Sequence, residues 1–184
     1  MPDTIAGDLA ARVLAGPPRL GSTRLLCIDG RSGAGKTALA LDVATRLSAP
    51  VLHLDLAYRG WHGLAAGLDV VRREVLEPLH RGEPGSYRQW DWHADQLGAR
   101  TLVSPTPTLV VEGVGACTAM FRRFATTTAW VEASTDARRE RALARDGDTF
   151  IPHWDVWAAQ EDALFAHDAV AAEVDVVIDN EERR

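Results

Sequence analysis

Residues 30–37 read Gly-Arg-Ser-Gly-Ala-Gly-Lys-Thr and match the pattern G-x-x-x-x-G-K-[ST]. In this pattern small residues let successive backbone N–H groups turn towards phosphate oxygens, and the following helix adds its N-terminal dipole. Lys36 can place its ammonium between the β- and γ-phosphates, and the Thr37 hydroxyl can coordinate the bridging magnesium. The motif predicts a site for the phosphates of ATP or GTP, made by Gly30, Arg31, Ser32, Gly33, Ala34, Gly35, Lys36 and Thr37.

Two acids end expected buried strands: Asp55 is the last residue of the strand expected over 51–55, and Glu112 is the last residue of the one expected over 108–112. In a mainly parallel α/β sheet the carboxyl ends of the strands meet at one edge, where ligands bind. A phosphotransferase needs one carboxylate to orient the acceptor hydroxyl and take its proton, and groups that hold magnesium or its water shell. We assign the first task to Asp55 and the second to Glu112, although which of them contacts the metal stays open. The alternative for either acid is to cap a turn or helix.

Aromatic residues gather in the least regular segments of the chain, where a planar ligand could stack. Tyr58 and Tyr87 add hydroxyl groups to these segments. Tyr87, Trp90 and Asp91 are our main candidates for contact with an acceptor molecule. The alternative for each tryptophan is that it seals the core beneath a loop. The tryptophans concerned are Trp61, Trp90, Trp92, Trp154 and Trp157.

Four arginines lie on a helix expected over 135–145. Residues three or four apart share a helix face, so Arg141 and Arg145 can turn together towards phosphate. Arg138 and Arg139 are interpreted as solvated or paired with acidic neighbours such as Glu140. The six histidines show no spacing typical of metal ligands, so the sequence predicts no zinc site.

The elements that must position these residues alternate between strands and helices. Apolar spacing predicts an opening helix through Ile5, Leu9 and Val13, and apolar runs and spacings then predict the remaining elements. The expected strands are 24–29, 51–55, 108–112, 127–132 and 174–179, and the expected helices are 36–47, 64–79, 135–145 and 153–170. The aromatic and charged residues of segment 87–100 follow neither the helical nor the strand period. The alternation predicts an α/β fold of the P-loop NTPase type, with a five-stranded, mainly parallel sheet and helices on both faces.

Size and composition limit the function classes. The 184 residues, 46% of them hydrophobic, predict a single domain over 1–184. A net charge of −6 lacks the basic excess that nucleic acid or an anionic membrane would favour, so we expect neither partner. The two cysteines do not resemble a disulfide framework, no apolar run is long enough to span a bilayer, and residues 1–16 lack a signal-peptide start. A cytoplasmic location is expected.

Four segments resemble the uridine kinase-like branch of the P-loop nucleoside and nucleotide kinases. They are Ile-Asp-Gly-Arg-Ser-Gly-Ala-Gly-Lys-Thr at 28–37, His-Leu-Asp-Leu-Ala-Tyr at 53–58, Val-Val-Glu-Gly at 110–113 and Arg-Ala-Leu-Ala-Arg-Asp at 141–146. The resemblance covers most of the chain and implies that Asp55 is the acceptor base, that Tyr58 shapes the acceptor pocket and that lid arginines contact the transferring phosphate. Leu56 stands where many relatives carry a second acid.

The sequence therefore predicts a phosphotransferase that uses Mg²⁺ and ATP to phosphorylate a small hydroxyl-bearing molecule, with nucleosides as the leading class. Lys36 would stabilise charge on the phosphates, Asp55 would orient the acceptor hydroxyl, and Arg145 would approach the γ-phosphate as a lid closes. One alternative is a kinase for another metabolite or an antibiotic. Another is a nucleotide-binding ATPase or regulatory module without an acceptor, whereas the missing Asn-Lys-x-Asp motif argues against a dedicated GTPase.

Overall fold

The structure is a computed structural model that describes residues 2–147 and 150–181. Its central sheet has five strands in the order β2-β5-β1-β6-β7, and all neighbouring strands in it run parallel. This confirms the expected α/β class and sheet. The strands are β1 (Arg24–Asp29), β2 (Val51–His53), β5 (Thr108–Glu112), β6 (Thr127–Glu132) and β7 (Val176–Asp179).

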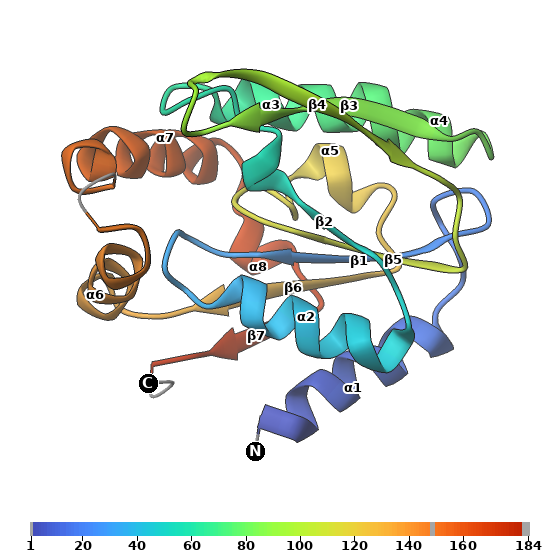
Figure 1. Ribbon diagram of the computed structural model, residues 1–184. Coiled ribbons are helices and arrows are strands. Elements are labelled where there is room, and N and C mark those ends of the chain that lie inside the picture. Colours follow the sequence, from blue (N-terminus) through green and yellow to red (C-terminus); the bar gives the residue numbers. More distant parts are fainter. Residues whose placement is uncertain (1, 148–149, 182–184) are drawn as a thin grey trace.

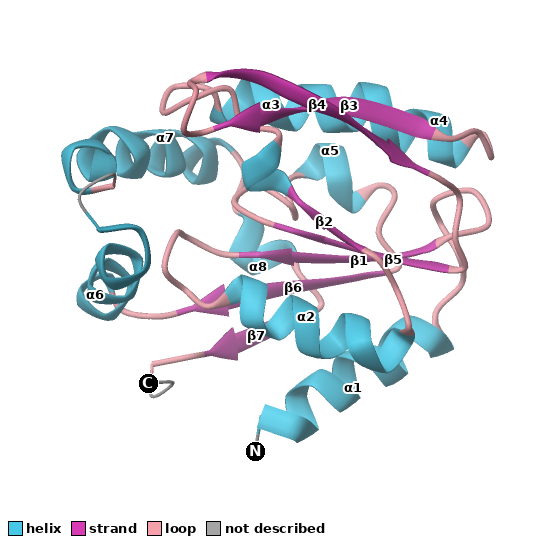
Figure 2. Cartoon of the chain, in the orientation of Figure 1, coloured by secondary structure: helices cyan, strands magenta, loops and turns pink. Residues whose placement is uncertain are grey.

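Helices cover both faces of this sheet (Figures 1 and 2). Because side chains alternate along a strand, β1 supplies both cores. Leu26 and Ile28 pack in the core beneath α1 and α2, whereas Leu25 and Cys27 belong to the larger core on the other face. The helices are α1 (Pro2–Ala15), α2 (Lys36–Leu47), α3 (Leu64–Val71), α4 (Glu77–His80), α5 (Ala119–Arg122), α6 (Thr135–Asp146), α7 (Trp154–His167) and α8 (Val170–Glu173).

The structure refines several expected bounds. Strand β2 ends at His53, and Leu54–Leu56 form a single 3₁₀ turn, so Asp55 follows the strand instead of ending it. The helix expected over 64–79 contains a π-helical stretch, Arg72–Leu76, between α3 and α4. The helix expected over 153–170 is divided, because α7 ends at His167 and α8 begins at Val170 after a break.

The segment that followed neither period is a β-hairpin outside the main sheet. Strands β3 (Gly85–Asp91) and β4 (Gln96–Val103) pair antiparallel, with a register shift between Arg88 and Trp90. Figure 1 shows the hairpin lying over α3 and α4. One of its sides meets this helical layer and the other meets solvent, which explains why Tyr87 is buried beside an exposed Arg88. Among the described residues, no helix combines the length and the apolarity needed to cross a bilayer.

Candidate active site

The glycine-rich loop joins β1 to α2 in a conformation that its glycines permit. Gly30, Gly33 and Gly35 have φ angles of 145°, 80° and 98°, in the region that side chains disfavour. The loop also lies against neighbouring backbone, because a Cβ on Gly33 would stand 2.0 Å from the carbonyl oxygen of Arg138. These constraints hold a strand–loop–helix turn at the N-terminus of α2, where anions bind favourably.

The side chains that follow the loop face Glu112, at the end of β5. The Lys36 ammonium donates a hydrogen bond to the Arg31 carbonyl at 3.0 Å, and its side chain is largely buried. Thr37 Oγ1 donates a hydrogen bond to Glu112 Oε1 at 3.2 Å. Two oxygen atoms that can coordinate a metal ion therefore lie together beside the loop, where magnesium would be expected. Strand β5 lies next to β1 in the sheet, and this pairing brings Glu112 to the loop.

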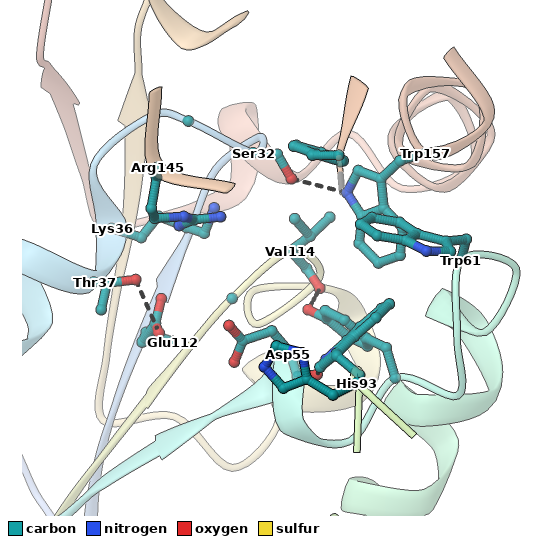
Figure 3. A pocket seen from close by; sticks show the side chains of 15 residues that line it. Ser32, Lys36, Thr37, Asp55, Trp61, His93, Glu112, Val114, Arg145 and Trp157 are labelled. Atoms are coloured by element: carbon teal, nitrogen blue, oxygen red, sulfur yellow. Dashed lines mark hydrogen bonds between the residues drawn. The ribbon is translucent and has the colours of Figure 1, made fainter. Parts of the chain in front are cut away.

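A cavity of about 610 Å³ opens beside this loop. This volume is in the usual range for small-molecule sites. Figure 3 shows Lys36, Thr37, Glu112 and Arg145 towards one end of the cavity, and Trp61 and Trp157 at the other. The residues that line it are Ser32, Gly33, Lys36, Thr37, Asp55, Tyr58, Trp61, Trp92, His93, Glu112, Gly113, Val114, Arg145, Phe150 and Trp157.

Asp55 projects into the cavity from the 3₁₀ turn after β2 (Figure 3). Asp55 keeps contact with solvent, but nearby protein atoms partly desolvate its carboxylate. This desolvation, followed by repulsion from Glu112, raises the pKa of Asp55, while His53, Arg145 and Lys36 act in the opposite direction. Asp55 is therefore a carboxylate of increased basicity that faces the same space as the phosphate loop.

His53 is a polar neighbour of this site that the sequence did not indicate. Its Nδ1 lies 2.6 Å from Glu112 Oε1, and this hydrogen bond raises the pKa of the imidazole against the opposing effect of burial. The two residues are 59 positions apart, so only the parallel pairing of β2 with β5, which opposes His53 to Glu112, brings them together. The one sequence feature that could have pointed to His53 is its position two residues before Asp55.

Asp29 ties the phosphate loop to the loop after β5. It is fully buried, and its carboxylate accepts hydrogen bonds from the backbone N–H groups of Gly30 at 2.7 Å and of Gly115 and Cys117, each at 2.8 Å. Burial raises the pKa of Asp29 to about 6, although these hydrogen bonds oppose the shift. This acid has a positioning role beneath the loop, since it does not line the cavity.

Helix α7 braces the phosphate loop from the other side. Glu161 is 1% exposed, and its Oε1 accepts hydrogen bonds from the Ser32 N–H at 2.8 Å and from Trp157 Nε1 at 2.9 Å. Its Oε2 lies 3.7 Å from the Arg31 guanidinium and 4.0 Å from that of Arg138. Arg138 is thus buried against the loop and faces an acid of another helix, whereas the expectation was a solvated residue or a pair with a neighbour such as Glu140. Neither Glu161 nor Arg138 belongs to a sequence motif, so the sequence did not indicate their role beside the loop.

The end of the cavity away from the phosphate loop has aromatic walls. Tyr58 is buried and donates its hydroxyl to the Val114 carbonyl at 2.8 Å. Trp157 donates to Ser32 Oγ at 2.8 Å and packs 5.2 Å from the ring of Tyr58, and therefore touches both the loop and the aromatic wall. Trp61 stacks on the ring of His153 at 4.5 Å. The sequence indicated the tryptophan cluster but did not distinguish which of its members line the cavity.

Three residues expected to contact the acceptor, and one arginine expected to face phosphate, lie outside this cavity. Tyr87 is 2% exposed and packs in the core, and the side chain of Trp90 is half-buried on the hairpin. The Asp91 carboxylate accepts the N–H groups of His93 and Ala94, which closes the hairpin turn. Arg141 donates to the backbone carbonyls of Asn180 and Glu181. In this structure the hairpin instead presents Trp92 and His93 to the cavity, because its turn, and not its strands, approaches Asp55.

The phosphate loop and the parallel sheet define a P-loop nucleotide-binding fold, and solved structures share this fold. A possible uridine kinase from Bacillus stearothermophilus has a TM-score of 0.68 at 20% identity, over 95% of this chain and 97% of that chain. A candidate fructose transport system kinase from Silicibacter sp. TM1040 has a TM-score of 0.63 at 18% identity, over 96% and 98%. No family model matches the sequence, and neither does any curated protein. The chain has the fold of P-loop kinases, and its resemblance to the uridine kinase-like branch is confirmed at the level of the fold.

Proposed function

We propose that the protein is a phosphotransferase that moves the γ-phosphoryl group of ATP to a hydroxyl group of a small molecule. The observation that carries this proposal is that Lys36, from the phosphate loop, and Asp55, after β2, line one cavity. Phosphoryl transfer needs little more than positioning and charge stabilisation. A cavity with a phosphate loop at one end and a carboxylate inside meets both needs.

The phosphate end of the cavity fits Mg-ATP. The loop amides and Lys36 would hold the phosphates, and Arg145, which lines the same cavity, would approach the γ-phosphate. Thr37 and Glu112 fit Mg²⁺, because a hydroxyl and a carboxylate 3.2 Å apart are hard oxygen ligands beside the phosphate position. A magnesium ion held by these residues would neutralise charge on the phosphates.

Asp55 is the residue that we propose to orient the acceptor hydroxyl and accept its proton. A base is more effective when its pKa lies nearer the working pH, and the raised pKa of Asp55 moves it in that direction. The buried Tyr58 hydroxyl, held by Val114, keeps the ring rigid beside this acid, so Tyr58 would shape the acceptor pocket without exchanging a proton.

The acceptor class that the aromatic walls support is a planar molecule with a hydroxyl group, and nucleosides lead this class. Aromatic faces stack on planar rings, whereas a simple sugar would need more hydrogen-bonding groups than this end of the cavity offers. The walls come from Trp61, Trp92, Phe150 and Trp157. A sugar, another metabolite or an antibiotic is the competing acceptor on the same scaffold.

The test is acceptor-dependent release of ADP. Purified protein with Mg-ATP is assayed against nucleosides, sugars, cofactor precursors and aminoglycosides, and phosphorylated products are identified by mass spectrometry. The Lys36→Ala variant controls for contaminating kinases, and Asp55→Asn tests the acceptor step. We expect one planar hydroxylated compound to raise ADP release and to appear as its phosphate.

Two results would contradict the proposal. If the protein binds neither Mg-ATP nor Mg-GTP, the assignment of the phosphate loop is wrong. If ADP release occurs at the same rate with and without every acceptor and no phosphorylated compound forms, the protein is an ATPase or a regulatory module.

A further inference from the structure

We propose that His53, Asp55 and Glu112 form a binding site for a transition-series divalent cation in the nucleotide-free protein. One potential ligand atom from each of these three residues lies within 4.8 Å of the other two. His53 ends β2, Asp55 follows in the 3₁₀ turn, and Glu112 ends the neighbouring strand β5. The site therefore stands at the carboxyl edge of the sheet.

Existing contacts already bring two of these groups together. His53 Nδ1 is directed at Glu112 Oε1, 2.6 Å away, and Glu112 also accepts the hydroxyl of Thr37. Ligand atoms around a tetrahedral zinc ion stand about 3.4 Å apart, as its bond lengths of about 2.1 Å require. The His53–Glu112 contact would open by less than an ångström, and small side-chain rotations would bring Asp55 closer. Asp55 lines the cavity, which supplies a route of entry.

Burial and charge also favour a cation at this point. The Glu112 side chain is 3% exposed and that of His53 is 29% exposed, so both are held by the surrounding fold. Two carboxylates of like charge share the site, and a divalent ion would offset the repulsion between them. The positive charges of Lys36 and Arg145 would repel the ion, because both are close enough to lower the pKa of Asp55. Lys36 is, however, hydrogen-bonded to the loop carbonyl of Arg31.

The imidazole determines the kind of metal. Magnesium prefers oxygen ligands in octahedral geometry, whereas imidazole nitrogen suits zinc, cobalt, nickel and copper. One imidazole with two carboxylates is therefore expected to prefer Zn²⁺ or Co²⁺ to Mg²⁺. This site overlaps the magnesium position beside Thr37, because Glu112 Oε1 contacts both His53 Nδ1 and Thr37 Oγ1. The inference for that reason concerns the protein without nucleotide.

The experiment is calorimetric titration of tag-free, nucleotide-free protein with Zn²⁺, Co²⁺ and Mg²⁺ as separate probes. We expect one Zn²⁺ or Co²⁺ ion per chain and much weaker binding of Mg²⁺. In His53→Gln the affinity for Zn²⁺ should be at least about tenfold lower, because even outer partners of metal ligands typically contribute tenfold or more. The matched control is His93→Gln, which removes another histidine of the cavity that is not part of the cluster, and should bind as wild type does.

Thermal unfolding gives a second readout, because an ion that binds only the folded chain raises its melting temperature. Zn²⁺ should stabilise wild type and His93→Gln but not His53→Gln. If His53→Gln does not fold, Asp55→Asn, at a position exposed to the cavity, provides the test and should also weaken Zn²⁺ binding. The inference is overturned if wild type does not bind Zn²⁺ or Co²⁺, if Mg²⁺ binds as tightly, or if the cluster variants bind as wild type does. No step uses ATP or an acceptor, so failure of the proposed kinase reaction gives a different result from failure of this site.

Discussion

Replacing Glu161 with glutamine tests whether the buried acid of α7 holds the phosphate loop. The substitution keeps the size and shape of the side chain but removes its charge. The carboxylate of Glu161 accepts N–H groups from Ser32 and Trp157 and faces the guanidinium of Arg138, which is 7% exposed. In the variant, the side-chain NH₂ group, itself a hydrogen-bond donor, faces the Arg138 guanidinium, another donor, where a carboxylate oxygen of Glu161 stood before.

The expected loss of stability follows from these contacts. Hydrogen bonds to a charged group contribute about 1.5–3 kcal/mol each, and removing one partner of a buried ion pair costs about 3–5 kcal/mol. The amide oxygen of glutamine, placed where Oε1 stands, can still accept both N–H groups, so the loss comes from the buried charge that faces Arg138. We therefore expect the free energy of unfolding to fall by about 3 kcal/mol, at the lower end of the range for a buried ion pair. For a domain of this size, each kcal/mol shifts the melting temperature by about 2–4 °C, which corresponds to about 6–12 °C here.

The assay is urea unfolding of wild type, Glu161→Gln and the control Asp162→Asn. Asp162 is the next residue on the same helix and pairs with Arg31 at 2.7 Å, but its side chain is 69% exposed. Such a surface pair contributes about 0–1 kcal/mol, so the control should stay close to wild type. Equal effects in the two variants, or a change below about 1 kcal/mol in Glu161→Gln, would refute the view that this acid braces the loop.

Four further predictions concern the loop, the acceptor step and pH. Lys36→Ala should weaken Mg-ATP binding at least about tenfold by calorimetry, since it removes the loop's ammonium. Asp55→Asn should leave the affinity for ATP within a few-fold of wild type but lower acceptor phosphorylation by about 10²-fold. Equal losses of ATP affinity and phosphorylation would indicate that Asp55 binds the metal or supports the fold instead. Gly33→Ala should destabilise the fold far more than Gly82→Ala, although their φ angles are 80° and 79°, because a Cβ at Gly33 meets backbone at 2.0 Å and one at Gly82 meets nothing within 4 Å. The raised pKa of Asp29, about 6 in the fold against an ordinary 3.8, means that the folded state binds this proton more tightly. Its contribution to stability is therefore greatest below pH 3.8 and is lost as pH rises through 6, and chemical unfolding should give a flatter pH profile for Asp29→Asn across this window.

Local patterns were sufficient for the sheet and for the phosphate loop. The apolar run of β1, the glycines after it and the spacing of α2 are consecutive in the chain, so each acts on its immediate neighbours. The hairpin was not predictable in this way, because one side of β3 packs against a helical layer whose position no local period records. The 3₁₀ turn after β2 was missed for a similar reason, since its residues continue the apolar pattern of the strand.

The sequence by itself determined that a phosphate loop follows a buried strand, and that acids stand near the ends of two further strands. Only the tertiary structure decided which side chains share the cavity. It brought His53 to Glu112 through the pairing of β2 with β5, and it placed Trp157 and Glu161 of α7 against Ser32. These contacts join residues from 59 to 129 positions apart. Their partners are chosen by the packing of whole elements against the sheet, and the spacing of residues within one element carries no record of that packing.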